Sequence, residues 1–366
     1  MRITTKTRPR QTRTTASPVR ARSYLDWNAT APLRPEARAA MLAAMDVVGN
    51  PSSVHAEGRA AKRLVETARR QVAAAVGCAP GEVVFTSGAT EAAQVLRGYG
   101  AVWVDAAAHD ALWAQRRTGG EAVGPTALAL GLAGGETGII VDLPTRDGDQ
   151  WVLGDAQGDI LLLDITQAVG RIPFAFSWSG ADIAILSGHK LGGPKGVGAL
   201  IVRQGLDIAP VQTGGGQEVS RRSGTENVIG ITGFGAAIEA AQRDLEAGVW
   251  DRVSRIRNIL EEMIAESANM TIFVGKDANR LPNTSCFITP GWKGETQVMV
   301  MDLAGFAVSA GSACSSGKVK ASPVLQAMGY DAKAAASALR VSLGPETTRA
   351  EVLRFCEAWH RENEKL

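Results

Sequence analysis

Hydrophobic and polar positions follow two different periods along the chain, and each period predicts its own kind of element. Apolar residues recur at helical spacing in RPEARAAMLAAM and in HAEGRAAKRLVETARRQVAAAVG, where Arg and Lys take the outward positions. Continuous apolar runs bounded by turns predict strands in EVVFTSG (82–88), ALALGLA, DILLLD (159–164), DIAILSG (182–188) and VGALIV (197–202). Because helical segments such as ATEAAQVLRGYG separate these runs, we expect an α/β fold with a mainly parallel central sheet covered by helices.

The pattern changes in the last third of the chain. A long, broken helical stretch covers residues 227–266, and short strands follow in TIFVG, TSCFITP, AVSAG and ALRVSLG, interleaved with helices. We therefore divide the chain into a basic leader (1–22), a large α/β domain (23–245) and a smaller α+β C-terminal domain (246–366). The large domain begins with a short strand and turn in YLDWNATAPL. These first residues can pack on the small domain.

Composition and charge exclude several classes of protein. With 45% hydrophobic and 21% charged residues in 366, the chain has enough apolar side chains for a large core, which excludes disorder. No run approaches the roughly 18 apolar residues of a membrane helix and no signal-peptide core follows the start, so we expect a cytoplasmic protein with no membrane partner. The net charge of the whole chain is +2, but residues 1–25 hold seven Lys and Arg and no acid, so the remainder has a net charge of −5. This mildly acidic remainder argues against direct nucleic-acid binding, which needs a clustered basic face. The composition of the leader is compatible with organelle targeting, but it fits a disordered leader or a misassigned start codon at least as well.

Histidines and cysteines are scattered without metal-ligand spacing, so no metal site is expected. Cys78, Cys286 and Cys356 fall in or beside predicted elements, where a cysteine behaves as a small buried hydrophobe. Cys314 lies instead among small residues and glycines in SAGSACSSGK (309–318), a predicted exposed loop. Lys318 and Lys320 follow it closely and favour its thiolate form, which makes Cys314 a candidate nucleophile.

Polar side chains follow the ends of the predicted strands, where ligands bind in doubly wound sheets. Thr86 to Thr90 connect one strand to a helix and offer hydroxyls and backbone N–H groups to a phosphate. Asp164 ends the next strand, and Ser187-Gly188-His189-Lys190 ends another. A lysine for a Schiff base, an acid for a pyridine nitrogen and a phosphate anchor together predict pyridoxal 5′-phosphate chemistry. Lys195 is the rival Schiff-base lysine, although it lies beyond a Gly-Gly-Pro turn.

Four motifs in this order carry a resemblance to a known family: Asp164-Ile165-Thr166-Gln167, Ser187-Gly188-His189-Lys190, Arg222-Ser223-Gly224-Thr225 and Gly311-Ser312-Ala313-Cys314. From Tyr24 almost to the C-terminus the chain resembles the cysteine desulfurases, in the fold-type I, class V aminotransferase group of pyridoxal phosphate enzymes. The resemblance extends to Tyr24-Leu25-Asp26-Trp27-Asn28-Ala29-Thr30, Gly49-Asn50-Pro51-Ser52-Ser53, Phe85-Thr86-Ser87-Gly88-Ala89-Thr90-Glu91, Pro282-Asn283-Thr284 and Arg340-Val341-Ser342-Leu343-Gly344.

The resemblance implies a role for each matching residue. Lys190 would carry the cofactor as a Schiff base, Asp164 would pair with its ring nitrogen, and Gln167 would bond its ring hydroxyl. His109 resembles the imidazole that stacks on the ring, and Arg340 the clamp for the substrate carboxylate, with Asn28 at the substrate's edge. The phosphate would be held by Ala89, Thr90, Ser187 and His189, together with Thr225 from the other subunit of a homodimer.

In the family that it resembles, L-cysteine gives up its sulfur and leaves as L-alanine. The Lys190 amine removes the α-proton, Cys314 attacks the sulfur and is left as a persulfide, and the sulfur passes to an acceptor. The short loop around Cys314 resembles the subgroup that serves iron–sulfur scaffold proteins or tRNA thiolation. The expected partners are therefore L-cysteine, a second copy of the chain and a sulfur-acceptor protein.

The chain departs from the family pattern in one segment. Gly134-Gly135-Glu136-Thr137-Gly138 stands where the family usually has Asn-Asn-Glu-Thr-Gly, and the stretch from His109 to Gly135 is shorter than usual. Loss of one hydrogen bond in a site costs roughly 1–3 kcal/mol, or about ten- to a hundredfold in rate, so we expect reduced or specialised activity. The alternatives are a selenocysteine lyase, another class V aminotransferase, and a non-catalytic paralogue that acts as an interaction protein.

Overall fold

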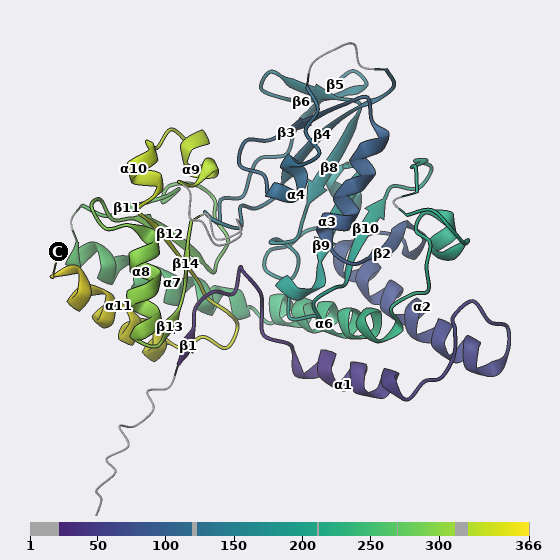
Figure 1. The fold of residues 1–366 in the computed structure, drawn as a ribbon, viewed down its shortest axis with the longest axis horizontal. Helices are drawn as coiled ribbons and strands as arrows, with labels where there is room; N and C mark the ends of the chain where they lie inside the picture. Colours follow the sequence, from purple (N-terminus) through teal and green to yellow (C-terminus); the bar gives the residue numbers. More distant parts are fainter. Residues whose placement is uncertain (1–21, 119–122, 211, 269, 312–320, 366) are drawn as a thin grey trace, which may run out of the picture.

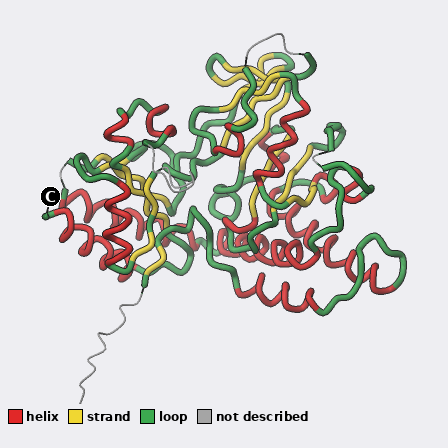
Figure 2. Tube along the Cα trace, in the orientation of Figure 1, coloured by secondary structure: helices red, strands yellow, loops and turns green. Residues whose placement is uncertain are grey.

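The computed structural model describes residues 22–118, 123–210, 212–268, 270–311 and 321–365 (Figure 1). The predicted leader, apart from Arg22, lies outside the described residues, as does Cys314. Figure 2 shows two groups of helices and strands, joined mainly by helical segments and by the chain near the N-terminus.

A six-stranded sheet forms the centre of the larger group. Its strands, in spatial order, are β2 (Val83–Thr86), β10 (Gly198–Val202), β9 (Ile183–Ser187), β8 (Ile160–Asp164), β4 (Thr126–Gly131) and β3 (Ala101–Val104). Neighbours from β9 to β3 run parallel, whereas β10 runs antiparallel to both β2 and β9. The prediction of a mainly parallel sheet is confirmed, and the antiparallel β10 is explained by its short connection from β9, which returns within the turn at 188–197.

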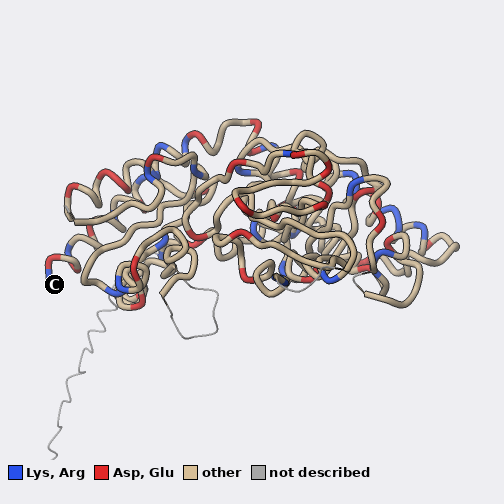
Figure 3. Tube along the Cα trace, turned by 90° about the horizontal axis from the view of Figure 1, so that it is seen from above, with Lys and Arg blue, Asp and Glu red and all other residues tan. Residues whose placement is uncertain are grey.

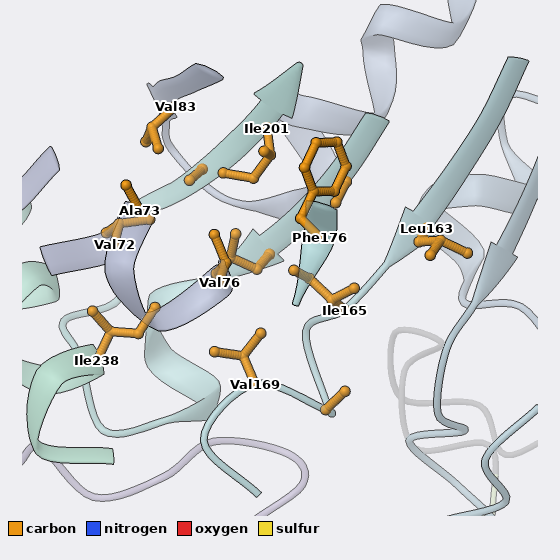
Figure 4. Packing of buried hydrophobic residues seen from close by; sticks show 14 of the residues in the cluster. Val72, Ala73, Val76, Val83, Leu163, Ile165, Val169, Phe176, Ile201 and Ile238 are labelled. Atoms are coloured by element: carbon orange, nitrogen blue, oxygen red, sulfur yellow. The ribbon is translucent and has the colours of Figure 1, made fainter. Parts of the chain in front are cut away.

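Alternate residues of the strands pack on opposite faces, as a strand period of two requires. Val83, Phe85 and Leu161 belong to one buried cluster, whereas Val84 and Leu162 belong to another. The first cluster, seen in Figure 4, packs under the long helices α1 (Pro35–Met45), α2 (Ala56–Val76) and α6 (Val228–Glu246). The second packs under the short elements α3 (Ala89–Ala92), η2 (Ala93–Gly98) and α4 (Asp110–Trp113). Both faces are therefore covered.

The C-terminal part builds a second sheet. Its strands are β11 (Ile272–Phe273), β12 (Thr284–Ile288), β15 (Ala338–Ser342) and β14 (Ser309–Ala310), all antiparallel to their neighbours. Helices α7 (Val249–Ser267), α8 (Gly294–Leu303) and α11 (Arg349–Asn363) contribute to a separate buried cluster with this sheet. The short helices α9 (Pro323–Ala327) and α10 (Ala332–Ala335) belong to this region too.

The N-terminal residues pack on this second region. Strand β1 (Ser23–Tyr24) pairs in parallel with β13 (Phe306–Ala307), and Asp26 forms a bridge with Ser342 of β15. The chain then crosses to α1, which lies against α6 (Figure 1). The division into domains at residues 23–245 and 246–366 stays a prediction, which the separate hydrophobic clusters support.

Several elements differ from the sequence-based expectation. The segment ATEAAQVLRGYG is the short helix α3 followed by the 3₁₀ turns of η2, and AVSAG divides into β13 and β14. Strand β3 was not predicted. Nor was a three-stranded antiparallel sheet formed by β5 (Thr145–Asp147), β6 (Gln150–Leu153) and β7 (Ala156–Gly158). Three further short elements are α5 (Phe176–Ser179), η1 (Pro80–Glu82) and η4 (Gln217–Ser220).

The described part of the chain contains no helix that is long and apolar enough to cross a membrane. Within the same residues, no group of three or more His, Cys, Asp or Glu side chains is arranged to hold a metal ion. Figure 3 shows basic and acidic residues interspersed over the elements rather than separated by sign.

Candidate active site

The ends of three strands meet at one edge of the central sheet. Asp164, the last residue of β8, lies opposite Ile185 of β9, and Ser187 ends β9 two residues later. Gly198, the first residue of β10, lies between Ser187 and Thr86, the last residue of β2. The register therefore brings together the strand ends from which the predicted cofactor residues emerge.

Lys190 is held against the N-terminal segment. It lies in the 3₁₀ turn η3 (Gly188–Lys190) directly after β9, and its Nζ donates hydrogen bonds to the carbonyl oxygens of Asn28 (2.6 Å) and Ala29 (2.9 Å). Gln167 joins it, because Gln167 Nε2 donates to the same Asn28 carbonyl at 3.1 Å. The predicted lysine and the predicted ring-hydroxyl partner thus share one acceptor.

Asn28 connects this edge to the second sheet. Its side chain is buried, and Nδ2 donates to Gly135 O (3.0 Å) and to Thr284 Oγ1 (2.9 Å). Asn28 Oδ1 accepts from Asn283 Nδ2 at 3.1 Å, and the backbone N–H of Asn28 donates to Ser342 Oγ at 3.0 Å. All of its polar atoms are therefore engaged, and Asn28 holds the two sheets in a fixed relation around Lys190.

Several polar groups lie together where the sequence predicts the phosphate of the cofactor. Ser187 Oγ accepts from the backbone N–H of Ala89 at 2.9 Å, and Thr90 next to it is exposed. Gly88 has φ of 156°, and a Cβ there would lie 3.2 Å from Ser187 Oγ, so glycine permits this close approach.

His189 belongs to the same group of side chains. Its Nδ1 lies 3.1 Å from Thr30 Oγ1, and burial, with the nearby Lys190 and Lys195, lowers its pKa to about 4. His189 is therefore neutral at pH 7.

Asp164 and His109 lie at the same edge of the sheet because β8, which ends at Asp164, and β3, which precedes His109, both run parallel to β4. Asp164 is half-buried, and its Oδ1 accepts from Thr166 N at 2.9 Å. His109 follows β3, which runs parallel to β4, and it begins α4. His109 Nδ1 accepts from Ala111 N at 3.1 Å, so the proton of the neutral ring resides on Nε2. Their predicted contacts with a cofactor ring stay predictions.

Arg340 is engaged by protein groups. In the middle of β15, its NH2 donates to Asp26 Oδ1 at 2.6 Å and its NH1 to Gly135 O at 3.2 Å, while Nε is buried without a partner. Asp26 Oδ2 in turn accepts from Ser309 Oγ at 2.8 Å. A substrate carboxylate would thus compete with Asp26 for this guanidinium.

Thr225 lies in the segment between η4 and α6 and is exposed. Arg222, three residues earlier, forms an ion pair with Glu91 of α3 at 2.9 Å. The segment is therefore tied to the phosphate side of the site, although the structure of a single chain does not test the role of Thr225 in a second subunit.

The described cysteines are poor nucleophiles, as expected for buried hydrophobes. Burial raises the pKa of the Cys78 and Cys356 thiols to about 12, and raises that of the fully buried Cys286 as well. Cys314, the predicted nucleophile, lies outside the described residues.

Three residues in the site were missed by sequence reasoning. Arg171 is a buried arginine, Glu136 is a half-buried acid with a raised pKa, and Asp26 is the partner of Arg340. Arg171 follows Gln167 by four residues, one helical turn, which is the only local signal for it. Burial raises the pKa of Glu136 to about 7. A hydrogen bond from Ser322 and the nearby Arg340 both lower this pKa, but burial has the larger effect.

Comparison with known proteins places the chain in a family. The Aminotransferase class-V family model matches residues 23–107 and 151–355, and leaves unmatched the segment that holds His109 and Gly134–Gly138. A cysteine desulfurase of Cereibacter sphaeroides is 37% identical over 92% of this chain and 94% of its own length.

Two solved structures share the fold. A NifS-like protein superposes with a TM-score of 0.83 at 26% identity, covering 94% of this chain and all of that one. A NifS-like protein from Rickettsia africae gives a TM-score of 0.80 at 28% identity over 94% of this chain and 99% of the other. With the sequence match over nearly its whole length, the chain belongs to the class V aminotransferase family and, within it, to the cysteine desulfurases.

Proposed function

We propose that the protein is a pyridoxal-phosphate-dependent cysteine desulfurase that takes sulfur from L-cysteine, releases L-alanine and holds the sulfur as a Cys314 persulfide. The observation that carries the proposal is the hydrogen-bonded network in which Lys190, Gln167 and Arg340 all contact Asn28 or Gly135. It joins the residues expected at the cofactor to the residue expected at the substrate carboxylate.

The side chains present fit an anionic pyridine cofactor. Arg171 and Arg340 lie beside Asn28 and Gly135, and of these two arginines only Arg340 has a carboxylate partner in the described part of the chain. Such an excess of buried positive charge suits a phosphate ester with an ionised ring oxygen. Lys190 would hold the aldehyde, Asp164 the ring nitrogen, Gln167 the ring oxygen and His109 the ring face, with Ala89, Thr90, Ser187 and His189 at the phosphate. When bound, the cofactor supplies an electron sink for the bonds at the substrate α-carbon.

The chain's own residues then have separate tasks. Arg340 binds the substrate carboxylate in exchange for part of its contact with Asp26. The Lys190 Nζ, held by two carbonyl oxygens, moves the α-proton. The Cys314 thiolate attacks the substrate sulfur, so that an S–S bond forms while the C–S bond breaks, and the carbon takes up a proton before alanine leaves.

Two partners complete the proposal. A homodimer would place Thr225 at the phosphate of the neighbouring subunit, and the exposure of Thr225 supports this. The sulfur acceptor would be an iron–sulfur scaffold or another sulfur-acceptor protein, in a cytoplasmic setting. Basic and acidic residues are interspersed along the described chain (Figure 3), which gives no support for a nucleic-acid partner.

The direct test follows alanine and sulfide from L-cysteine with the purified protein. We expect both products from the wild type with a reductant present, and neither from Cys314→Ala, while Cys78→Ala, a matched control at a thiol outside the site, keeps the activity. Cys314→Ala that still forms alanine at the wild-type rate would refute the role of Cys314 as sulfur acceptor, and conversion of L-cysteine to its keto acid without alanine would favour another class V aminotransferase. Selenocysteine supplied in place of cysteine, if it alone were turned over, would favour a lyase.

We further propose that the activity is reduced by the glycines at 134 and 135. Gly135 packs against Gln167, since a Cβ there would lie 3.1 Å from Gln167 Nε2, and a Cβ at Gly134 would lie 2.7 Å from Thr137 Oγ1. The chain has therefore closed around the space of the side chains that relatives with Asn-Asn would place there.

Gly135→Asn tests this point, with Gly135→Ala as the steric control. Position 135 needs no left-handed backbone, so both variants are expected to fold after a small shift of Gln167. If a missing amide limits the rate, Gly135→Asn exceeds Gly135→Ala in kcat/KM by about tenfold. Equal values for the two variants, or a wild type as fast as ordinary desulfurases, would contradict reduced activity.

A further inference from the structure

Arg171 is a buried arginine that contacts three site residues at once. It is 5% exposed, and NH1 donates to Asn28 Oδ1 (2.8 Å) and to Gln167 Oε1 (2.5 Å). NH2 donates to the carbonyl oxygen of Lys190 at 2.9 Å. Its backbone is fixed in turn, because Trp250 of α7 donates from Nε1 to the carbonyl of Gly170.

These contacts fix the orientation of the Gln167 amide. A guanidinium has only donors, so the group that faces it must be an acceptor, which is Gln167 Oε1. The amide nitrogen Nε2 is then turned the other way, toward the Asn28 carbonyl that also accepts from Lys190 Nζ. Gln167 can therefore only donate toward the space beside Lys190, and it selects an acceptor there.

The charge of Arg171 is not balanced by the protein. No carboxylate pairs with it in the described residues, and the charged group that acts on it is another cation, Arg340. Burial, and then Arg340, lower its pKa to about 9, which still leaves it charged at pH 7. A buried cation without a partner is costly unless an anion binds nearby.

We infer that Arg171 is a positioning residue that holds Gln167 as a donor to the ring oxygen of bound pyridoxal phosphate and keeps that oxygen deprotonated. The inference rests on the proposed function, because it requires the cofactor at Lys190. Arg171 reaches the ring oxygen only through Gln167, and its positive charge opposes any added proton on the conjugated system of ring oxygen and Schiff-base nitrogen.

The inference has a spectroscopic consequence. The absorbance of bound pyridoxal phosphate changes with protonation of that conjugated system, and it does so without substrate. A fixed positive charge beside the system favours the deprotonated form, so it lowers the pH at which the spectrum changes. Removal of the charge raises this midpoint.

The experiment titrates the loaded enzyme from pH 6 to pH 10 by absorbance. Arg171→Gln and Arg171→Met both remove the charge, and either one that folds and holds the cofactor is expected to raise the midpoint by about one pH unit. Arg171→Lys keeps the charge and stays near the wild-type midpoint. Gln167→Leu keeps the Arg171 charge but removes the amide between it and the ring oxygen, and we expect it to raise the midpoint in the same direction.

A matched control is Arg257→Gln. Arg257 is also a buried arginine that donates to backbone carbonyls, those of Leu281 (3.3 Å) and Thr284 (3.4 Å), and its loss leaves the midpoint unchanged. An unchanged midpoint in a loaded neutral variant at 171, or in Gln167→Leu, would overturn the inference while the proposed function stands. A wild type that takes up no pyridoxal phosphate would instead overturn the proposed function.

Discussion

At the scale of single residues, Glu136 is an acid whose protonated form the fold favours. One of its oxygens, Oε1, is buried without a partner, and it lies 2.4 Å from where a Cβ at Gly311 would be, so a side chain at 311 would displace this carboxyl group. Ser322 and Arg340 favour its charged form, but burial outweighs them and raises its pKa to about 7. The folded protein therefore binds this proton more tightly than the unfolded chain.

The stability of the protein should depend on pH through this residue. Since the folded pKa is raised from 4.5 to about 7, the charged form destabilises the fold, and stability falls as pH rises between these values. Glu136→Gln cannot ionise, so relative to the wild type it gains of the order of 3 kcal/mol between pH 4.5 and pH 8. Chemical unfolding at several pH values measures this difference.

An exposed glutamate provides the comparison. Glu262 of α7 is exposed, and Glu262→Gln should show no such pH-dependent gain. A Glu136→Gln variant whose stability relative to the wild type is the same at pH 4.5 and pH 8 would show that Glu136 is charged in the fold at little cost.

At the scale of elements, Asp182 attaches the β5–β7 sheet to the central sheet. It is fully buried at the start of β9, and its Oδ2 accepts from Trp151 Nε1 of β6 and from Leu161 N of β8, both at 2.9 Å. Arg203 completes the set with an ion pair at 2.9 Å. Gly158 allows β7 to approach β4, since a Cβ there would lie 2.6 Å from Leu128 N.

Asp182→Ala should therefore destabilise the protein strongly. It leaves the Trp151 indole N–H and the Leu161 N–H without their acceptor, at a cost of about 1–3 kcal/mol each, whereas the half-exposed Arg203 can bond water instead. Asp182→Asn keeps one acceptor oxygen and loses less, and Asp147→Ala at an exposed position of β5 changes stability by no more than about 0.5 kcal/mol. Denaturant midpoints measure the stability of each variant. Equal losses of stability in Asp182→Ala and Asp147→Ala would contradict this role of Asp182.

The same elements show what local pattern predicts and what it does not. The buried strands β2, β4, β8, β9 and β10 were predicted because each is a continuous apolar run. Strand β5 is exposed throughout and consists of Thr, Arg and Asp, so nothing in its composition indicated a strand. The antiparallel direction of β10 depends on the short turn before it, which the apolar pattern does not contain.

The site shows a similar division. Lys190, Asp164 and Ser187 were predicted because they directly follow predicted strands. The partnership of Arg340 with Asp26 joins residues 314 positions apart, and that of Arg171 with Asn28 joins residues 143 apart. Such contacts arise from tertiary packing, so neither sequence periodicity nor spacing indicates them.

At the scale of the whole molecule, the proposed homodimer determines whether each site is complete. The segment with Thr225 is held on the phosphate side by the Arg222–Glu91 ion pair, while Thr225 itself is exposed. If Thr225 serves the partner's phosphate, each site takes Lys190 from one subunit and Thr225 from the other.

Mixed dimers test this arrangement. Thr225→Asp places a carboxylate at the phosphate and Lys190→Ala removes the Schiff-base lysine, so each homodimer should be inactive. Random co-assembly gives one intact site in half of the dimers, and activity should recover to about a quarter of the wild type. No recovery in dimers verified as mixed would show that Thr225 serves its own subunit's site.

The central claim is that Lys190 holds pyridoxal phosphate at the edge of the central sheet, and borohydride reduction tests it most directly. The account predicts a yellow protein whose spectrum L-cysteine perturbs, and in which reduction fixes a phosphopyridoxyl group on the peptide containing Lys190. A colourless protein that takes up no cofactor, or a label on Lys195 in its place, would contradict it.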